Sequence, residues 1–382
     1  MRGLVRVSLW WAALTYLVPI YPLYAVFFAD TGLSGAEISL LFLIWSSVSV
    51  LAEVPLGAVA DRFSRRSSLV GASLLQALGY VLWIGLPGFT GFAVGFVLWG
   101  LGGALESGAF EALLYDGLAG QGEESAFALV NGRVTAVNLL TELPTAVLAS
   151  GLFALGGYRL AAWVSVGVCL AAAWVASRFP EAARGADDGE LGYVELLKVG
   201  LREAADNRVV RHALIVVALL GGLDAFEEYF PLMALAWGVP AGWVPLAMVG
   251  IPLAGAVGAA LGGFGSGLRT RTLGVLLGVA VAVLVVSGVL RSPAGLLAVA
   301  GFYGLYQLVL VVAEARLQDS IEGPARATVT SVAGIGIEVS ALAVYGVWAL
   351  GEVFGVAALV ALVALLLPRW LRQAPVVERL PR

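Results

Sequence analysis

Apolar residues run through this chain in stretches that are longer than the helices of an ordinary soluble domain. Residues 7–28, 38–60 and 67–87 are examples, and each is long enough for a helix to cross a hydrocarbon core, which takes about 20 residues. Of the 382 residues, 60% are hydrophobic and only 13% are charged, which is about half the charged fraction of a typical soluble protein. The sequence therefore predicts an all-α polytopic membrane protein.

We expect twelve transmembrane helices in two six-helix, pseudo-symmetric bundles. Several spans are longer than a core of ~30 Å requires, so these helices are expected to tilt. The first bundle is expected at 1–178, and the second, with a short tail, at 208–382. The expected spans are 7–28, 38–60, 67–87, 89–118, 125–155, 157–178, 208–237, 242–265, 272–290, 293–321, 325–350 and 352–371.

The longest polar segment, 179–207, separates the two sets of six spans. Its second part carries Leu191, Val194, Leu197 and Leu201 near helical spacing. This pattern favours an amphipathic helix on the inner membrane surface, within a cytoplasmic linker.

Positive charge is distributed very unevenly among the loops. If the N-terminus lies inside, the outer loops hold only Arg159 and Arg291, and almost all other arginines outside the spans fall on the inner side. Because positively charged loops stay in the cytoplasm, we expect both termini to be cytoplasmic and the protein to be a multi-pass protein of the cell membrane.

A short repeat supports the division into two halves. The fourth expected span ends in EALLYD, residues 111–116, and the tenth ends in EARLQD, residues 314–319. Parallel six-helix repeats imply two halves related by an axis along the membrane normal. The alternative is a chance match between helices of similar composition.

The loop between the second and third expected spans carries a charged motif. Its residues are Gly57, Val59, Ala60, Asp61, Arg62, Ser64, Arg65, Arg66 and Leu69. With these residues and the twelve expected helices, the chain resembles the major facilitator superfamily. That family has the pattern G-x-L-A-D-[RK]-x-G-[RK]-[RK]-x-x-[LI] at this place, and here Val59 replaces the leucine and Ser64 the second glycine. The resemblance implies the major facilitator fold and secondary transport. Within the family, the drug/proton antiporter branch is a candidate.

The same loop is a candidate conformational latch. A carboxylate such as Asp61 suits the partial positive charge of a helix N-terminus, and the resemblance suggests the helix that begins near Ala325. Arg65 or Arg66 is expected to pair with Asp116. These contacts would lock the two halves on the inner side and favour an outward-open state, whereas the alternative is that the arginines only set the topology. The candidate latch residues are Gly57, Asp61, Arg62, Arg65, Arg66, Asp116 and Arg133.

Acidic residues inside membrane spans are costly and usually functional. Here they outnumber the basic residues in the spans, so some of them must be protonated, face water or bind a cation. The helical rise places Glu106, Glu142 and Glu338 near the middle of the bilayer. The acidic residues are Glu53, Glu106, Glu111, Glu142, Asp224, Glu227, Glu228, Glu314 and Glu338, and the basic ones are Arg133 and Arg316.

Arg133 lies at a depth similar to that of Glu53 and Glu111. It is therefore expected to neutralise one of these carboxylates across a helix contact. Such a pair is either structural or part of the coupling mechanism, and both interpretations stay open.

Asp224, Glu227 and Glu228 are spaced i, i+3 and i+4, so we expect them to share one face of the helix at 208–237. Repulsion among three like charges favours a bound proton or cation, toward the outer half of the helix. The alternative is that this part of the helix already lies in an outer aqueous mouth.

Tyrosines on the first expected span are candidate substrate contacts. Aromatic rings beside carboxylates suit organic cations or amphipathic molecules. Tyrosines near a membrane interface are, however, often belt residues. We assign the pocket role to Tyr16 and Tyr21, which lie deeper, and the belt role to Tyr24.

The leading hypothesis is a proton-coupled secondary transporter that exports a small cationic or amphipathic molecule by rocker-switch alternating access. The alternative is a proton-coupled importer of a nutrient, siderophore or metabolite, because the segment ELPTAVLASGL keeps Pro144 but few glycines of the drug-exporter motif. The expected partners are a small-molecule substrate, protons and membrane lipid, with no nucleic acid, and the chain is expected to be a monomer.

We expect neither an enzyme nor a resident cofactor or metal. The chain has one histidine, His212, and one cysteine, Cys169, so the common nucleophile–base pairs have few candidates. A Gly-rich phosphate loop of the G-x-x-x-x-G-K-[ST] type is also missing from the sequence.

Overall fold

The computed structural model describes residues 2–62, 64–107, 109–180, 207–265, 267–321 and 326–371. These residues form α-helices joined by short turns and 3₁₀ helices. They divide into two compact units, each of which is described by itself below.

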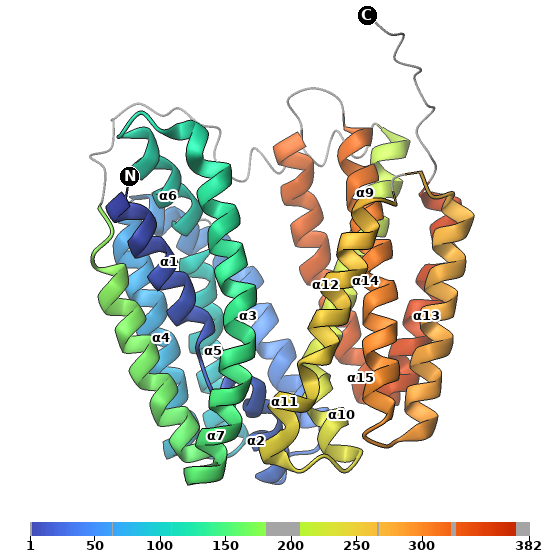
Figure 1. The fold of residues 1–382 in the computed structure, drawn as a ribbon, viewed down its shortest axis with the longest axis horizontal. Coiled ribbons are helices and arrows are strands. Elements are labelled where there is room, and N and C mark those ends of the chain that lie inside the picture. The colour runs from blue at the N-terminus through green and yellow to red at the C-terminus, as the bar shows by residue number, and fades with distance from the viewer. Residues whose placement is uncertain are drawn as a thin grey trace, which may run out of the picture. The chain divides into compact units, whose positions relative to one another are not determined.

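The described residues of the first unit lie within Met1–Asp188 and Val239–Val249. The second stretch packs on α7, where Gly242 lies against the ring of Phe153. The elements of this unit are α1 (Arg2–Tyr16), η1 (Tyr21–Leu23), α2 (Tyr24–Asp30), α3 (Gly35–Arg62), α4 (Arg65–Gly85), α5 (Phe89–Glu106), α6 (Ala109–Ala119), η2 (Glu124–Ala126), α7 (Phe127–Ala176), η4 (Ala241–Trp243) and α11 (Val244–Met248) (Figure 1).

The described residues of the second unit lie within Gly189–Gly238 and Gly250–Arg382. Its elements are α9 (Arg208–Gly222), η3 (Leu223–Tyr229), α10 (Phe230–Ala236), α12 (Gly250–Gly263), α13 (Thr270–Leu290), α14 (Gly295–Ser320) and α15 (Arg326–Trp370). Of the expected linker 179–207, the part from 181 to 206, including its amphipathic helix, lies outside the described residues. The tail beyond Leu371 also lies outside them.

Ten helical stretches in the described part of the chain are long and apolar enough to cross a membrane. Two of them, Glu124–Ala176 and Val332–Trp370, have 53 and 39 residues, and a single crossing needs only about 20. Both contain a break in the helical backbone, the first at Gly156 and Gly157 and the second at Glu352. These breaks fall where we expected one span to end and the next to begin.

An exposed ion pair lies at the break at Glu352. Glu352 has a backbone φ of 47°, and Arg291, which follows α13, has a φ of 40°. Residues other than glycine rarely adopt such positive φ angles. The Arg291 guanidinium donates a hydrogen bond of 3.3 Å to the Glu352 carboxylate. The ion pair therefore joins the turn that ends α13 to the turn that divides α15.

Aromatic side chains fill the core of the first unit. Tyr24 is only 2% exposed, and its ring centroid lies 5.5 Å from that of Phe28, 5.8 Å from that of Trp83 and 5.8 Å from that of Phe96. The prediction that Tyr24 is a belt residue at the membrane interface is therefore wrong. The backbone breaks between Tyr16 and Tyr24, so the face on which each aromatic lies does not follow from a continuous helix.

Closely packed glycines bring α12 and α14 of the second unit together. A Cβ atom added to Gly258 would overlap the backbone carbonyl of Gly304, and one added to Gly304 would lie 2.9 Å from the carbonyl oxygen of Ala254. Small residues that let two helix backbones touch are the usual means of helix association in membranes.

We predict that Gly258→Ala destabilises the protein, because the new methyl group has no room beside Gly304. Overpacking of this kind costs roughly 1–3 kcal/mol and should appear as a lower Tm in detergent. Gly278→Ala on α13 is the matched control, since nothing lies within 4 Å of its added Cβ. An equal Tm for the two variants would contradict this account of the α12–α14 contact.

Candidate functional site

The first long helix of each unit is interrupted at the same position. In the first unit α1 has 15 residues and α2 has 7, and residues 17–23 separate them. In the second unit α9 has 15 residues, the 3₁₀ helix η3 has 7 and α10 has 7. Interruptions at corresponding positions of two repeated halves are typical of ligand sites in membrane proteins.

Side chains from neighbouring helices satisfy the backbone groups that these interruptions release. The Ile20 amide donates to the Ser165 hydroxyl at 3.0 Å. The Thr145 hydroxyl lies 3.0 Å from the Tyr16 carbonyl and 2.7 Å from the Thr141 carbonyl, and it can donate its one proton to either of them. In the second unit the Tyr306 hydroxyl donates to the Leu220 carbonyl at 2.8 Å. Because an unpaired backbone group in hydrocarbon costs several kcal/mol, these contacts stabilise the interrupted form of each helix.

Two carboxylates of η3 share polar partners on α14. The Tyr303 hydroxyl donates to Asp224 at 2.8 Å and lies 3.4 Å from the Glu227 carboxylate. The Gln307 amide donates to Asp224 at 3.1 Å. A phenol has only one proton to donate, so Tyr303 can donate to one of the two carboxylates at a time, and the two negative charges repel each other. The arrangement suits an added proton or a bound cation.

Glu228 does not belong to this pair. In a 3₁₀ helix three residues complete a turn, so Asp224 and Glu227 lie on the same side and Glu228 lies a third of a turn further round. Glu228 is only 7% exposed, and with Glu338 it lies close enough to Tyr345 of α15 for its charge to act on that side chain. The prediction of three carboxylates on one face is therefore wrong, because the segment is not α-helical.

The interruption in the first unit is lined by aromatic rather than acidic residues. Tyr16 and Tyr21 are 46% and 42% exposed. The ring of Tyr21 stacks on Trp99 of α5, with centroids 5.8 Å apart and an interplanar angle of 19°. Glu106 follows Trp99 by two helical turns and so lies on the same face of α5. An added Cβ at Gly103, between them, would meet nothing within 4 Å, so this face is open.

The remaining sequence-predicted acids of the first unit are more scattered. Glu53 of α3 accepts a hydrogen bond of 3.4 Å from the Ser107 hydroxyl. Glu106 and Glu111 lie within electrostatic reach of each other. Glu142 is exposed on α7, and the structure does not bring it into either cluster. The candidate site is thus concentrated at the two interruptions.

The expected contact between the motif loop and the fourth span is confirmed. Arg65, the first residue of α4, forms an ion pair with Asp116 of α6, and their side chains are 23% and 46% exposed. Ser64 caps α4, because its hydroxyl accepts a hydrogen bond of 2.9 Å from the Ser67 amide. The pair joins two helices of the same unit.

The other half of the expected latch lies outside what the structure describes. The side chains of Asp61 and Arg62 are not among the described residues, and neither is Ala325. The contact of Asp61 with a helix N-terminus, and the locking of the two halves, therefore stay predictions.

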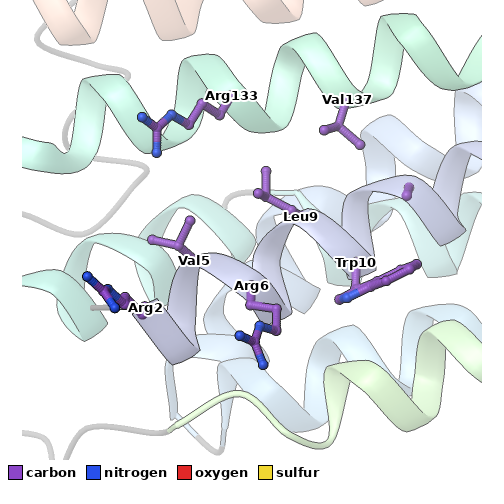
Figure 2. Close-up of a pocket in the computed structure, with 8 residues that line it drawn as sticks. Arg2, Val5, Arg6, Leu9, Trp10, Arg133 and Val137 are labelled. Atoms are coloured by element: carbon purple, nitrogen blue, oxygen red, sulfur yellow. The ribbon is translucent and has the colours of Figure 1, made fainter.

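Arg133 is placed differently from our expectation. It is exposed on α7 and forms no ion pair with Glu53 or Glu111 in the described part of the chain. The buried face of this helix is occupied by residues such as Val130 and Val134, which leaves Arg133 on the side that lines a groove with α1 (Figure 2). The expected pairing of Arg133 with Glu53 or Glu111 is therefore wrong, and its place in the latch stays a prediction.

The second unit has a related contact at the corresponding place. Arg316 of α14 donates to the Thr270 hydroxyl at 2.9 Å and to the Leu268 carbonyl. Thr270 is the first residue of α13, as Arg65 is the first residue of α4. The third and fourth helices of each unit are thus joined by an arginine, although its partner differs.

Sequence reasoning missed Tyr303 and Gln307, the partners of the acidic pair. A signal was present, because Tyr303, Tyr306 and Gln307 are polar residues at i, i+3 and i+4 in an apolar span, and such residues share one helix face. What the sequence did not show is that this face meets η3.

A family model described as the Major Facilitator Superfamily matches residues 8–344 of the chain. Among solved structures, a D-xylose–proton symporter is similar with a TM-score of 0.74 and 12% identity, over 97% of this chain and 98% of that one. A POT family transporter has a TM-score of 0.72 and 13% identity, over 97% of both chains. A nucleoside transporter has a TM-score of 0.74 and 11% identity, over 96% of this chain and 98% of that one. A search of curated proteins finds no match.

We predict that the Arg65–Asp116 pair contributes measurably to stability, because one partner is largely shielded from solvent. A double-mutant cycle of Arg65→Gln and Asp116→Asn, followed by chemical unfolding in detergent, should give a coupling of about 1 kcal/mol. The control cycle is Arg291→Gln with Glu352→Gln, whose side chains are 61% and 65% exposed, and its coupling should be near zero. A larger coupling in the control would show that exposure does not rank these pairs.

Proposed function

Since the chain belongs to the Major Facilitator Superfamily, and is therefore a multi-pass membrane protein with a transporter fold, we propose that it is a proton-coupled secondary transporter. Its substrate is a small cationic or amphipathic molecule, which it exports by rocker-switch alternating access. The family and the transporter structures that the chain resembles point to transport rather than enzymatic catalysis.

One observation carries the proton coupling. Asp224 and Glu227 face a single phenolic hydroxyl, that of Tyr303, at an interruption of their helix. Two carboxylates that both lie within 3.4 Å of the same hydroxyl oxygen repel each other when ionised, so the pair is stabilised when it takes up a proton or a cation. Competition between the two for the same pair is the simplest basis of exchange, because binding one disfavours the other.

The aromatic residues of the first unit support a cationic or amphipathic substrate. Tyr16 and Tyr21 are partly exposed, and Tyr21 extends a stack with Trp99 toward the face that carries Glu106. A cation over an aromatic face gains electrostatic energy, and more so away from water. Sugars and other neutral polar molecules would gain less from such a surface.

The topology is part of the proposal. Twelve crossings follow if the breaks at 156–157 and 352 are tight turns between separate spans. The excess of arginine at one end of the spans supports cytoplasmic termini in the cell membrane. The proposed latch is Gly57, Asp61 and Arg62 together with the Arg65–Asp116 pair, and we propose that the chain acts as a monomer.

The direction and coupling can be tested in proteoliposomes that contain a pH-sensitive dye. With an acidic interior, external organic cations should enter as protons leave, so an antiporter raises the internal pH. If nutrients added with external acid instead lower the internal pH, the chain is an importer that works by symport. Import is the second candidate because few glycines of the drug-exporter motif lie near Pro144. Unchanged internal pH in both directions across a broad cation and metabolite library would overturn proton coupling.

In the same assay, Asp224→Asn should bind the cationic substrate more weakly and should not use the pH gradient, because the pair that binds the proton and the cation in turn is incomplete. Glu124→Gln is the control variant, since Glu124 is exposed in the turn before α7. Coupled transport by Asp224→Asn at the wild-type rate would remove the acidic pair from the mechanism.

Tyr303→Phe should slow coupled transport by about 10- to 100-fold, because hydrogen bonds to charged groups contribute roughly 1.5–3 kcal/mol. Tyr306→Phe is the matched control, since its hydroxyl donates to the Leu220 carbonyl and not to a carboxylate. It should lower Tm while leaving the transport rate per folded molecule within about threefold. Equal losses of rate in the two variants would argue against a specific role for Tyr303.

A further inference from the structure

A groove of about 730 Å³ runs between α1 and α7 of the first unit, and the proposed transport mechanism does not use it (Figure 2). Its basic lining consists of Arg2, Arg6 and Arg133, all of them exposed. Within the described residues none of these guanidinium groups forms an ion pair. Three cationic side chains and no anionic one line the groove, so the groove favours an anionic occupant.

Charge and hydrophobicity are sorted along this α1–α7 groove. Arg2 and Arg6 lie in the first two turns of α1, and Trp10 follows them. Arg133 likewise precedes Val137 on α7. Since a helix rises 1.5 Å per residue, about 12 Å separates Arg2 from Trp10 along the helix axis. One end of the groove is therefore cationic and the other apolar, which is the polarity of a phospholipid.

The apolar half of the groove is open to an occupant. Val5 and Leu9 lie on the side of α1 that faces α7, opposite Arg133 and Val137 (Figure 2). The Trp10 side chain is 61% exposed, and an indole has an apolar body with one N–H donor, so it suits the boundary between headgroup and acyl chain. A free inorganic anion would leave this half unfilled.

The second unit carries a different side chain at the position equivalent to Arg6. Arg6 is the fifth residue of α1, and the fifth residue of α9 is His212. The ring of His212 stacks on Trp370 at the end of α15, with centroids 6.2 Å apart. The open, triply basic groove is thus a feature of the first unit that the fold alone does not require.

We propose that the α1–α7 groove is a binding site for an anionic phospholipid. The three arginines hold the phosphate, and one acyl chain lies against Trp10 and Val137. The lipid belongs to the leaflet that surrounds the N-terminal end of α1. The site does not depend on the direction or the substrate of transport, so it can fail while the proposed function holds, and the reverse.

The full-length chain in a neutral detergent can be titrated with dioleoylphosphatidylglycerol and followed by native mass spectrometry. Phosphatidylcholine with the same acyl chains is the neutral-lipid comparison and should bind more weakly. Each arginine replaced by glutamine should weaken phosphatidylglycerol binding about fivefold, and Arg6→Gln/Arg133→Gln about 25-fold. Arg159→Gln, the same charge change at an exposed position elsewhere on α7, should bind like the wild type.

Two further measurements separate a lipid from other occupants. Trp10→Ala should weaken phosphatidylglycerol binding, and millimolar inorganic phosphate should not displace the lipid, because phosphate cannot fill the apolar half. The proposal is overturned if Arg6→Gln/Arg133→Gln retains wild-type affinity while its Tm shows that it is folded. It is also overturned if inorganic phosphate displaces the lipid, or if phosphatidylcholine binds equally well.

Discussion

In hydrocarbon there is no water to pair with a backbone amide or carbonyl, and this constraint governs the whole structure. It forces the chain into helices, and it makes every interruption of a helix depend on a side chain from elsewhere. Ser165 meets that need at the break after α1, where Thr145 also lies within reach of the Tyr16 carbonyl, and Tyr306 does so at the break after α9. The polar residues of the fold are therefore concentrated where the backbone departs from the α-helix, and the candidate site lies at the same places.

The interruption in the second unit also determines which carboxylates act together. Because η3 is a 3₁₀ helix, Asp224 and Glu227 fall on one side and both face Tyr303, while Glu228 turns toward the α15 side of the unit. In a regular α-helix Glu228 would join them and a third negative charge would have to be compensated. The local winding of seven residues thus limits the cluster to a pair that one proton or one cation can balance.

The sequence predicted the membrane class, the approximate spans and the Arg65–Asp116 contact, because hydropathy and charge are properties of composition along the chain. It did not predict the packing partners of those spans. Tyr24 and Arg133 were misassigned because both were placed by depth along the span. Depth alone does not say which side of a helix meets which neighbour, and Tyr24 lies in the aromatic core. Tyr303 and Gln307 were missed for the same reason: their polarity was visible, but the tertiary contact that gives it meaning was not.

The two units repeat one backbone design with different side chains, and this difference separates two tasks. Counting from Arg2 of α1 and Arg208 of α9 aligns Val18 with Asp224 and Tyr21 with Glu227. The first unit therefore places an aromatic residue where the second places a carboxylate. Under the proposed function, recognition of the substrate's shape rests more on the first unit and charge exchange more on the second. Changes at Tyr21 should then alter which substrates are accepted while leaving coupling intact, whereas changes at Asp224 should do the opposite, because neither side chain can supply the chemistry of the other.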